Sequence, residues 1–189
     1  DGYLLQYFKD FNVPALGFDP TVNTAKAAKD KGIDTIVEFF GEKTAANQLV
    51  EKGLKADLFI GNNVLAHVPD INDFIQGFTI LLKEGGIATF EFPHLLQLVD
   101  GVKFDTVYHE HFSYLSFGTV VNLFSKNGLN VFDVEKIGTH GGSLRVYAQR
   151  SDTGKHDIDT RVEKLISEEN TAGMTSIAFY CGFQEHAEQ

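Results

Sequence analysis

Residues 56–92, ADLFIGNNVLAHVPDINDFIQGFTILLKEGGIATFEF, decide the fold. The apolar run at 56–61 is typical of a buried strand, and so is the run at 87–92 that follows Gly85-Gly86. Between them, Asp70 is a good helix N-cap. The apolar residues behind it recur with the spacing of a helix that buries one face. They are Ile71, Phe74, Ile75, Phe78, Leu81 and Leu82. A strand, a helix and a strand in this order predict parallel strands.

The same alternation extends toward the N-terminus. Prolines and glycines mark the points where elements start and stop. We expect helices at residues 3–11, 21–31 and 42–52, and strands at residues 14–18 and 35–40. Strict alternation of strands and helices predicts an α/β fold with a doubly wound, mostly parallel sheet.

The rhythm changes in the last third of the chain. A helix is expected at residues 117–126, followed by strands at 129–137 and 143–150 that share a short glycine-rich link. Two such strands predict an antiparallel hairpin at the end of the sheet. The sequence then turns polar, with an amphipathic helix at 158–169. We therefore expect a core domain at residues 1–150 and the start of a C-terminal region at 151–189.

Composition and charge exclude several classes of function. The formal charge of −10 and the lack of a Lys/Arg-rich run argue against nucleic acid as a partner. The apolar stretches are short and interrupted by charges, so no membrane-spanning helix is expected. The single cysteine, Cys181, offers no disulfide framework and is typical of a cytoplasmic protein.

Residues at three strand ends are candidates for binding a nucleotide-like cofactor, because ligands of doubly wound sheets lie at the carboxyl ends of the strands. The candidates are Asp19, the pair Phe39 and Phe40, and the pair Asn62 and Asn63. A carboxylate can accept both hydroxyls of a ribose, aromatic rings can flank an adenine, and amides can donate and accept. Simpler interpretations stay open: Asp19 as a helix cap, the Phe pair as core, and the Asn pair as a turn.

Histidines concentrate in the middle of the chain, and His67, His94 and His140 follow strand ends that we expect to face the ligand crevice. The segment Tyr108-His109-Glu110-His111 is the densest group, with a phenol, a carboxylate and two imidazoles. These are the components of a general base whose protonation is set by its neighbours. Such a base could remove a proton from carbon beside a ketone, with His or Tyr donating to the enolate oxygen.

A zinc site is the competing interpretation of this segment. On a regular strand His109 and His111 would share one face and could bind zinc together with His67 or His140, as in a metal-dependent hydrolase. Tyr108 and Glu110 would then face the other way. The two hypotheses therefore predict different geometries.

Five segments resemble the nucleotide-sugar C-methyltransferases, which methylate a ring carbon beside a keto group of a dTDP-linked deoxysugar with S-adenosylmethionine. The resemblance runs from residue 1 to about 150, and its fold is the Rossmann-like class I methyltransferase fold. The segments are Asp1-Gly2-Tyr3-Leu4-Leu5, residues 61–70, Glu91-Phe92-Pro93-His94-Leu95, residues 108–114 and residues 139–145.

The resemblance implies specific roles for residues of this chain. His111 would be the base that removes the proton alpha to the ketone, with Tyr108, Glu110 and His67 lining the reacting carbon. S-adenosylmethionine would supply the methyl group, and S-adenosylhomocysteine would be its product. The implied cofactor contacts are Asp1, Gly2, Asp19, Phe39, Phe40, Asn62 and Asn63. The partner would be a nucleotide-linked keto-deoxysugar, with no metal at these sites.

The chain also departs from the family pattern. Family members carry an N-terminal cysteine-rich zinc module, a first strand with its glycine loop and a long C-terminal domain. We expect this chain to start just inside the cofactor loop, so zinc belongs to the missing module and the central first strand is absent. The resemblance then implies that activity belongs to a longer parent enzyme, and that the fragment itself binds cofactor poorly. A non-catalytic nucleotide-binding module stays open as an alternative.

Overall fold

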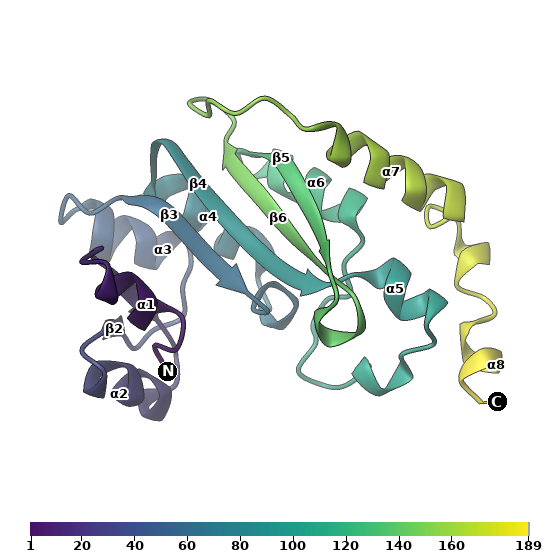
Figure 1. The fold of residues 1–189 in the computed structure, drawn as a ribbon, viewed down its shortest axis with the longest axis horizontal. Coiled ribbons are helices and arrows are strands. Elements are labelled where there is room, and N and C mark those ends of the chain that lie inside the picture. The colour runs from purple at the N-terminus through teal and green to yellow at the C-terminus, as the bar shows by residue number, and fades with distance from the viewer. Residues whose placement is uncertain (189) are drawn as a thin grey trace.

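The computed structural model describes residues 1–188 as strands and helices in alternation, with a hairpin near the end (Figure 1). The strands are β1 (Leu16–Phe18), β2 (Asp34–Ile36), β3 (Ala56–Asn62), β4 (Leu82–Pro93), β5 (Leu129–Ile137) and β6 (Ser143–Arg150). The longer helices are α1 (Leu5–Asp10), α2 (Val22–Asp30), α4 (Ile71–Leu81), α5 (Leu95–Asp100), α6 (Phe117–Lys126) and α7 (Thr160–Ala172). Over these residues no helix combines the length and apolarity needed to cross a membrane.

The strands form two sheets rather than one. β1 and β2 pair in parallel, and the larger sheet has the order β3-β4-β6-β5. β3 and β4 are parallel, whereas β6 runs antiparallel to both β4 and β5. Within residues 1–188 no strand joins the two sheets. The α/β class, the parallel pairs and the antiparallel hairpin are therefore confirmed, and the parallel part is divided between two sheets.

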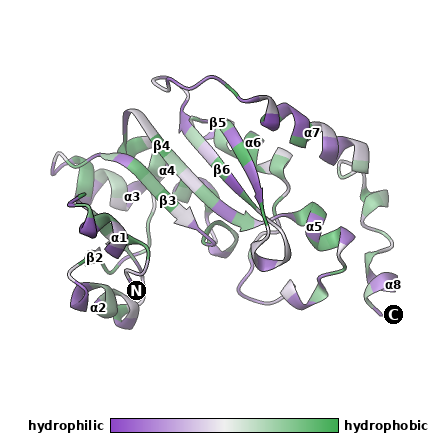
Figure 2. Ribbon diagram, in the orientation of Figure 1, coloured by the Kyte–Doolittle hydropathy of each residue, from purple (hydrophilic) through white to green (hydrophobic). Residues whose placement is uncertain are grey.

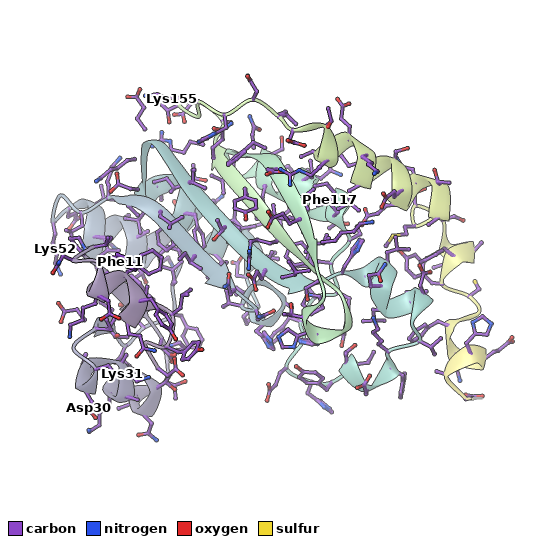
Figure 3. All side chains as sticks on the ribbon, viewed as in Figure 1. Phe11, Asp30, Lys31, Lys52, Phe117 and Lys155 are labelled. Atoms are coloured by element: carbon purple, nitrogen blue, oxygen red, sulfur yellow. The ribbon has the colours of Figure 1, made fainter. Side chains whose placement is uncertain are left out.

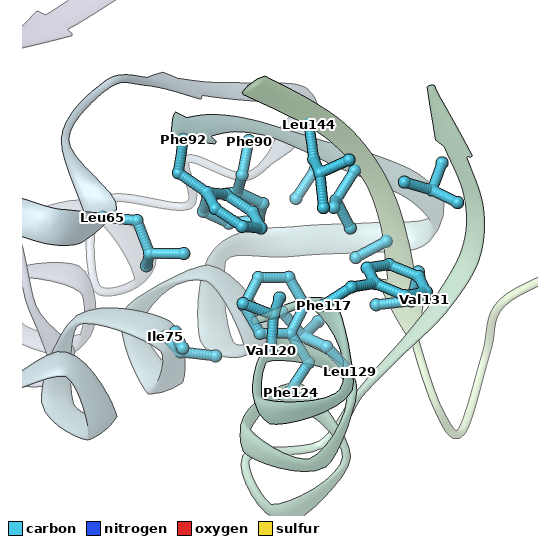
Figure 4. Close-up of a cluster of buried hydrophobic side chains, with 14 of the residues drawn as sticks. Leu65, Ile75, Phe90, Phe92, Phe117, Val120, Phe124, Leu129, Val131 and Leu144 are labelled. Atoms are coloured by element: carbon cyan, nitrogen blue, oxygen red, sulfur yellow. The ribbon is translucent and has the colours of Figure 1, made fainter. Parts of the chain in front are cut away.

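One face of the larger sheet is covered by α4 and α6, and this packing makes the main core. Phe90 of β4 lies between Phe78 of α4 and Phe124 of α6, with ring centroids 4.8 and 4.9 Å away. Figure 4 shows Phe90 and Phe92 facing Phe117 and other side chains of α6. Edge-to-face rings in a buried core add to the free energy gained by burying their surface.

Local signals set the helix ends. The side chain of Asp70 accepts a hydrogen bond from the backbone N–H of Asp73 at 3.1 Å, which starts α4 as predicted. Ser116 caps α6 in the same way through the N–H of Thr119. Gly128 follows α6 with a φ of 82°, a backbone conformation that glycine adopts without strain.

Several expected element boundaries differ from the structure, and two of them differ by four or more residues. β4 starts at Leu82 instead of residue 87, because the Gly85-Gly86 segment forms a bulge opposite β3 and does not end the strand. β2 ends at Ile36, so Phe39 and Phe40 lie in the loop before the next helix. That helix, α3 (Glu42–Thr44), continues as a π-helical segment, Ala45–Val50, which the sequence did not indicate.

The polar helix α7 is fixed to this core (Figure 2). Val162 and Leu165 enter the main hydrophobic cluster. Glu169 of α7 is 5% exposed, and its Oε1 accepts the backbone N–H of Phe117 at 2.6 Å. Phe117 is labelled beside α7 in Figure 3. Oε2 of Glu169 accepts the N–H of Gly118 at 2.8 Å, and His94 Nε2 lies 2.7 Å from Oε1. The proposed domain boundary at residue 150 thus precedes a helix that packs on the core.

We expect the stability of the fold to depend on Glu169 and on pH. Burial alone would raise the pKa of Glu169, but hydrogen bonds from His94 and from the N–H groups of Gly118 and Phe117 lower it below the ordinary value of 4.5. A carboxyl with a depressed folded-state pKa stabilises the fold above its ordinary pKa, and this contribution is lost as the pH falls through the folded-state value. Urea unfolding at a series of pH values should show this loss below pH 4.5.

The variant Glu169→Gln should lower the free energy of unfolding by about 3 kcal/mol at neutral pH, because it breaks a buried, hydrogen-bonded pair. Its stability should then decline less on acidification than that of the wild type. Glu168→Gln is the matched control, since Glu168 pairs with Lys136 at the surface, and exposed pairs contribute about 0–1 kcal/mol. Equal losses in the two variants would contradict the assignment.

Candidate active site

The loop between α5 and α6 docks onto the turn that follows β3. The backbone N–H groups of Phe112 and Ser113 both donate to the carbonyl of Ala66, at 2.8 and 3.2 Å. His67 Nδ1 lies 3.0 Å from the carbonyl oxygen of Glu110. These contacts bring the Tyr108–His111 segment next to His67, at the carboxyl end of β3, as the sequence led us to expect.

His111 is held on both sides of its ring. Nδ1 lies 2.9 Å from the carbonyl oxygen of Thr106, and Nε2 lies 3.0 Å from the hydroxyl of Tyr108. A carbonyl only accepts, so Nδ1 carries the proton and the neutral ring presents a lone pair at Nε2. The Tyr108 hydroxyl therefore donates to Nε2. The ring centroids of Tyr108 and His67 lie 4.2 and 4.7 Å from that of His111.

The geometry of residues 108–111 differs from the strand on which the zinc hypothesis depends. Residues 108–111 form a turn closed by the N–H of His111 and the carbonyl of Tyr108, at 3.1 Å, and not a strand. His109 and His111 therefore share no strand face. Among the described residues no three His, Cys, Asp or Glu side chains gather closely enough to hold a metal ion.

Glu110 was expected to line the reacting carbon, but it contacts the cluster through its backbone and not through its side chain. Its side chain is exposed, and the contact it makes to the cluster is the backbone carbonyl that faces His67. Beside the cluster lies a small pocket with mostly apolar walls, to which His111, Tyr114, Pro93 and Leu95 contribute. The ring of Tyr114 meets that of His111 edge to face at 5.7 Å.

The cofactor candidates at the strand ends are accessible. Asp19 follows β1, and its Oδ1 accepts the backbone N–H of Thr21 at 2.8 Å. Because Thr21 is itself the N-cap residue of α2, Asp19 shapes the turn before the helix, and the helix-cap interpretation was wrong. Asn62 and Asn63 are exposed at the end of β3. Asn63 has a φ of 53°, and its backbone N–H donates to the carbonyl of Glu91 at 2.8 Å. The amide side chains of this pair are thus presented by a turn that the backbone fixes.

The remaining candidates divide between surface and interior. Phe39 is 74% exposed, whereas the ring of Phe40 packs against Phe78 with a centroid distance of 4.9 Å, as the core interpretation predicts. Gly2 has a φ of 70°, and a Cβ there would lie 3.1 Å from the Cα of Ala28, so it permits close packing on α2. Asp1 is exposed and accepts the N–H of Tyr3.

The sequence missed two buried polar groups. His94, expected in the crevice, is 1% exposed and faces Glu169. Glu91 is 7% exposed and accepts a hydrogen bond from Arg145 Nε at 2.7 Å, in register with Asn62 on the neighbouring strand. Strand alternation around Phe90 and Phe92 could have placed Glu91 on the opposite face of β4. His140 is exposed, in a tight turn with a φ of 51°.

The tautomer of His111 can be measured directly. We expect ¹⁵N NMR of histidine-labelled protein above neutral pH to show His111 protonated at Nδ1, because the Thr106 carbonyl accepts that proton. Tyr108→Phe should shift the Nε2 resonance, which loses its donor, and leave Nδ1 protonated. Observation of an Nε2–H tautomer in the wild type would overturn this geometry.

The fold is that of the class I S-adenosylmethionine-dependent methyltransferases, and solved structures of this class share it. They include an S-adenosylmethionine-dependent methyltransferase from Mesorhizobium loti, with a TM-score of 0.59 at 14% identity over 79% of this chain and 86% of that one. Magnesium protoporphyrin IX methyltransferase of Synechocystis with bound S-adenosylhomocysteine gives a TM-score of 0.54 at 16% identity, over 74% and 65%.

The chain belongs to the methyltransferase domain family, whose model matches residues 1–134. A model described as the C-methyltransferase C-terminal domain matches residues 138–189. C-methyltransferase NovU of Streptomyces niveus is 34% identical over 188 residues, an alignment that covers all of this chain and 44% of that protein. The resemblance to C-methyltransferases is thereby confirmed. The chain spans less than half the length of this relative.

Proposed function

We propose that the full-length protein transfers a methyl group from S-adenosylmethionine to the carbon alpha to a ketone of a nucleotide-linked deoxysugar. The observation that carries the proposal is the His111 ring, which presents an unprotonated Nε2 beside Tyr108 and His67 in a methyltransferase fold. The match to a C-methyltransferase supports methylation at carbon. Methylation of a carbon alpha to a ketone needs a base that removes its proton, so the cluster fits this chemistry.

The side chains account for the proton and the developing charge. His111 Nε2 takes the alpha proton, and the electron pair of the broken C–H bond forms the enolate. Tyr108 must release Nε2 for this step, and its hydroxyl can then donate to the enolate oxygen. The hydrogen bond from Nδ1 to Thr106 stabilises the resulting imidazolium. S-adenosylmethionine, when bound, would supply an electrophilic methyl group. The enolate carbon would form a bond to this methyl group as the sulfur–methyl bond breaks, and the sulfur would keep that electron pair in S-adenosylhomocysteine.

The residues at the strand ends fit the cofactor. Asp19 has a second carboxylate oxygen, Oδ2, to accept a ribose hydroxyl, while Oδ1 accepts the backbone N–H of Thr21. The exposed Asn62 and Asn63 amides can donate and accept toward an amino-acid or adenine moiety, and Phe39 offers an exposed ring. Asp1 and Gly2 complete the proposed set. Phe40 would act indirectly, since its ring supports this loop from the core.

Further parts of the proposal concern partners and setting. The substrate is the nucleotide-linked keto-deoxysugar, and the charge of −10 argues against nucleic acid. We place the reaction in the cytoplasm, a setting that a single cysteine suits. Residues 1–150 form the methyltransferase core and 151–189 begin a C-terminal region. Zinc is assigned to a separate N-terminal module of the family.

We expect His111→Ala to reduce methyl transfer by the full-length protein at least about 100-fold, the usual contribution of a general base. His109→Ala is the matched control, because His109 is exposed two residues away and should leave turnover near that of the wild type. Methyl transfer from labelled S-adenosylmethionine to a keto-deoxysugar nucleotide measures the effect. Unchanged turnover in His111→Ala would overturn the assignment of the base.

Cofactor binding can be tested separately by calorimetry with S-adenosylhomocysteine. Asp19→Asn should weaken binding by at least about tenfold, since a hydrogen bond to a charged group contributes about 1.5–3 kcal/mol. Asp57→Asn, at the opposite end of β3, should leave the affinity unchanged. Absence of any binding heat in the wild-type full-length protein would favour a non-catalytic module instead.

A further inference from the structure

We propose that His94 and Glu169 are positioning residues, a buried clasp that couples α7 to the loop carrying His111. The inference rests on the proposed function for its catalytic consequence. Glu169 belongs to the segment matched by the C-methyltransferase C-terminal domain, and its three partners belong to the methyltransferase domain. The clasp therefore joins the two matched segments at one carboxylate.

Both oxygens of Glu169 are occupied. Oε1 accepts the N–H of Phe117 at 2.6 Å and faces His94 Nε2 at 2.7 Å, and Oε2 accepts the N–H of Gly118 at 2.8 Å. Because Oε1 acts as an acceptor, Nε2 of His94 carries the proton. The carboxylate also lies at the N-terminus of α6, where the helix dipole favours a negative charge.

The composition of the clasp suggests a role beyond stability. His94 and Glu169 are 1% and 5% exposed, and His94 Nδ1 is the one buried side-chain polar atom in residues 1–188 without a hydrogen-bond partner. Taking such groups out of water is costly, and an apolar pair of similar volume often stabilises a protein equally well. A directional pair, in contrast, fixes the relative position of the elements it joins.

The backbone at His94 contacts the loop that carries His111. His94 forms an isolated parallel bridge with Leu115, and the N–H of Leu95 donates to the carbonyl of Leu115 at 3.1 Å. Leu115 follows His111 by four residues, and the pocket beside His111 is walled by Pro93 and Leu95, the two neighbours of His94. On its other side the N–H of His94 donates to the carbonyl of Gly142 at 3.1 Å.

A displacement of His94 would thus move both the wall of the pocket and the anchor of the loop. Misplacement of catalytic groups by about 1 Å can cost about 100-fold in rate. The clasp makes the position of His111 depend on α7, so that the C-terminal segment acts on the chemistry without contacting the substrate.

Two substitutions of His94 separate positioning from packing. His94→Phe keeps a ring but removes the Nε2 donor, whereas His94→Gln keeps an N–H donor close to the place of Nε2. In the full-length protein we expect His94→Phe to lower kcat at least tenfold with KM for S-adenosylmethionine changed less than twofold, and His94→Gln to restore most of kcat. ¹⁵N NMR of His111 should show loss of its single Nδ1–H tautomer in His94→Phe and its return in His94→Gln.

Other outcomes overturn the inference. If His94→Phe lowers the unfolding temperature while kcat and the His111 resonances stay as in the wild type, the clasp serves stability alone. If the wild type transfers no methyl group, the proposed function fails, and the NMR comparison still decides whether the clasp positions His111. If His94→Phe does not fold, hydrogen exchange in the wild type replaces it: the amides of Gly118 and Phe112 should open together, and independent opening refutes the coupling.

Discussion

β4 is paired on both of its edges and packed on one face, and the candidate site lies at its carboxyl end. β3 lies on one edge and β6 on the other, while Phe90 and Phe92 bury one face of β4 against α4 and α6. A strand held in this way has no freedom to shift its register. The carboxyl end of β4 is therefore held in one position. The pocket beside His111, the bridge to Leu115 and the contact with Glu169 all involve residues within two positions of Pro93.

The candidate site combines the carboxyl end of β4 with the loop between α5 and α6, which has little regular structure. Hydrogen bonds from Phe112 and Ser113 to Ala66 attach the loop to the end of β3, and Thr106 fixes the ring of His111. Catalytic groups on loops need such support, because the loop backbone does not hold them by itself. The cofactor candidates lie at strand ends of both sheets: Asp19 follows β1, and Asn62 and Asn63 lie at the end of β3. The proposed function therefore needs residues from both sheets as well as from the loop.

Periodicity and capping predicted those features that depend on neighbours in sequence. The bounds of α6, β5 and β6 agree with the sequence, because Ser116, Gly128 and the glycine-rich link act locally. The Tyr108–His111 segment stood out by its density of titratable groups. The burial of His94 could not be predicted, since its partner Glu169 is 75 residues away. Likewise Phe39 and Phe40 are neighbours of the same type in the sequence, and only the fold separates the exposed ring of Phe39 from the half-buried ring of Phe40.

In the proposed function His111 removes a proton from carbon before methyl transfer. Solvent exchange tests this step, with the full-length protein incubated with a keto-deoxysugar nucleotide and S-adenosylhomocysteine in D₂O. We expect deuterium at the carbon alpha to the ketone, detected by mass spectrometry and NMR, and its loss in His111→Ala but not in His109→Ala. Exchange that persists unchanged in His111→Ala, or that is absent from an active wild-type protein, would show that His111 is not this base.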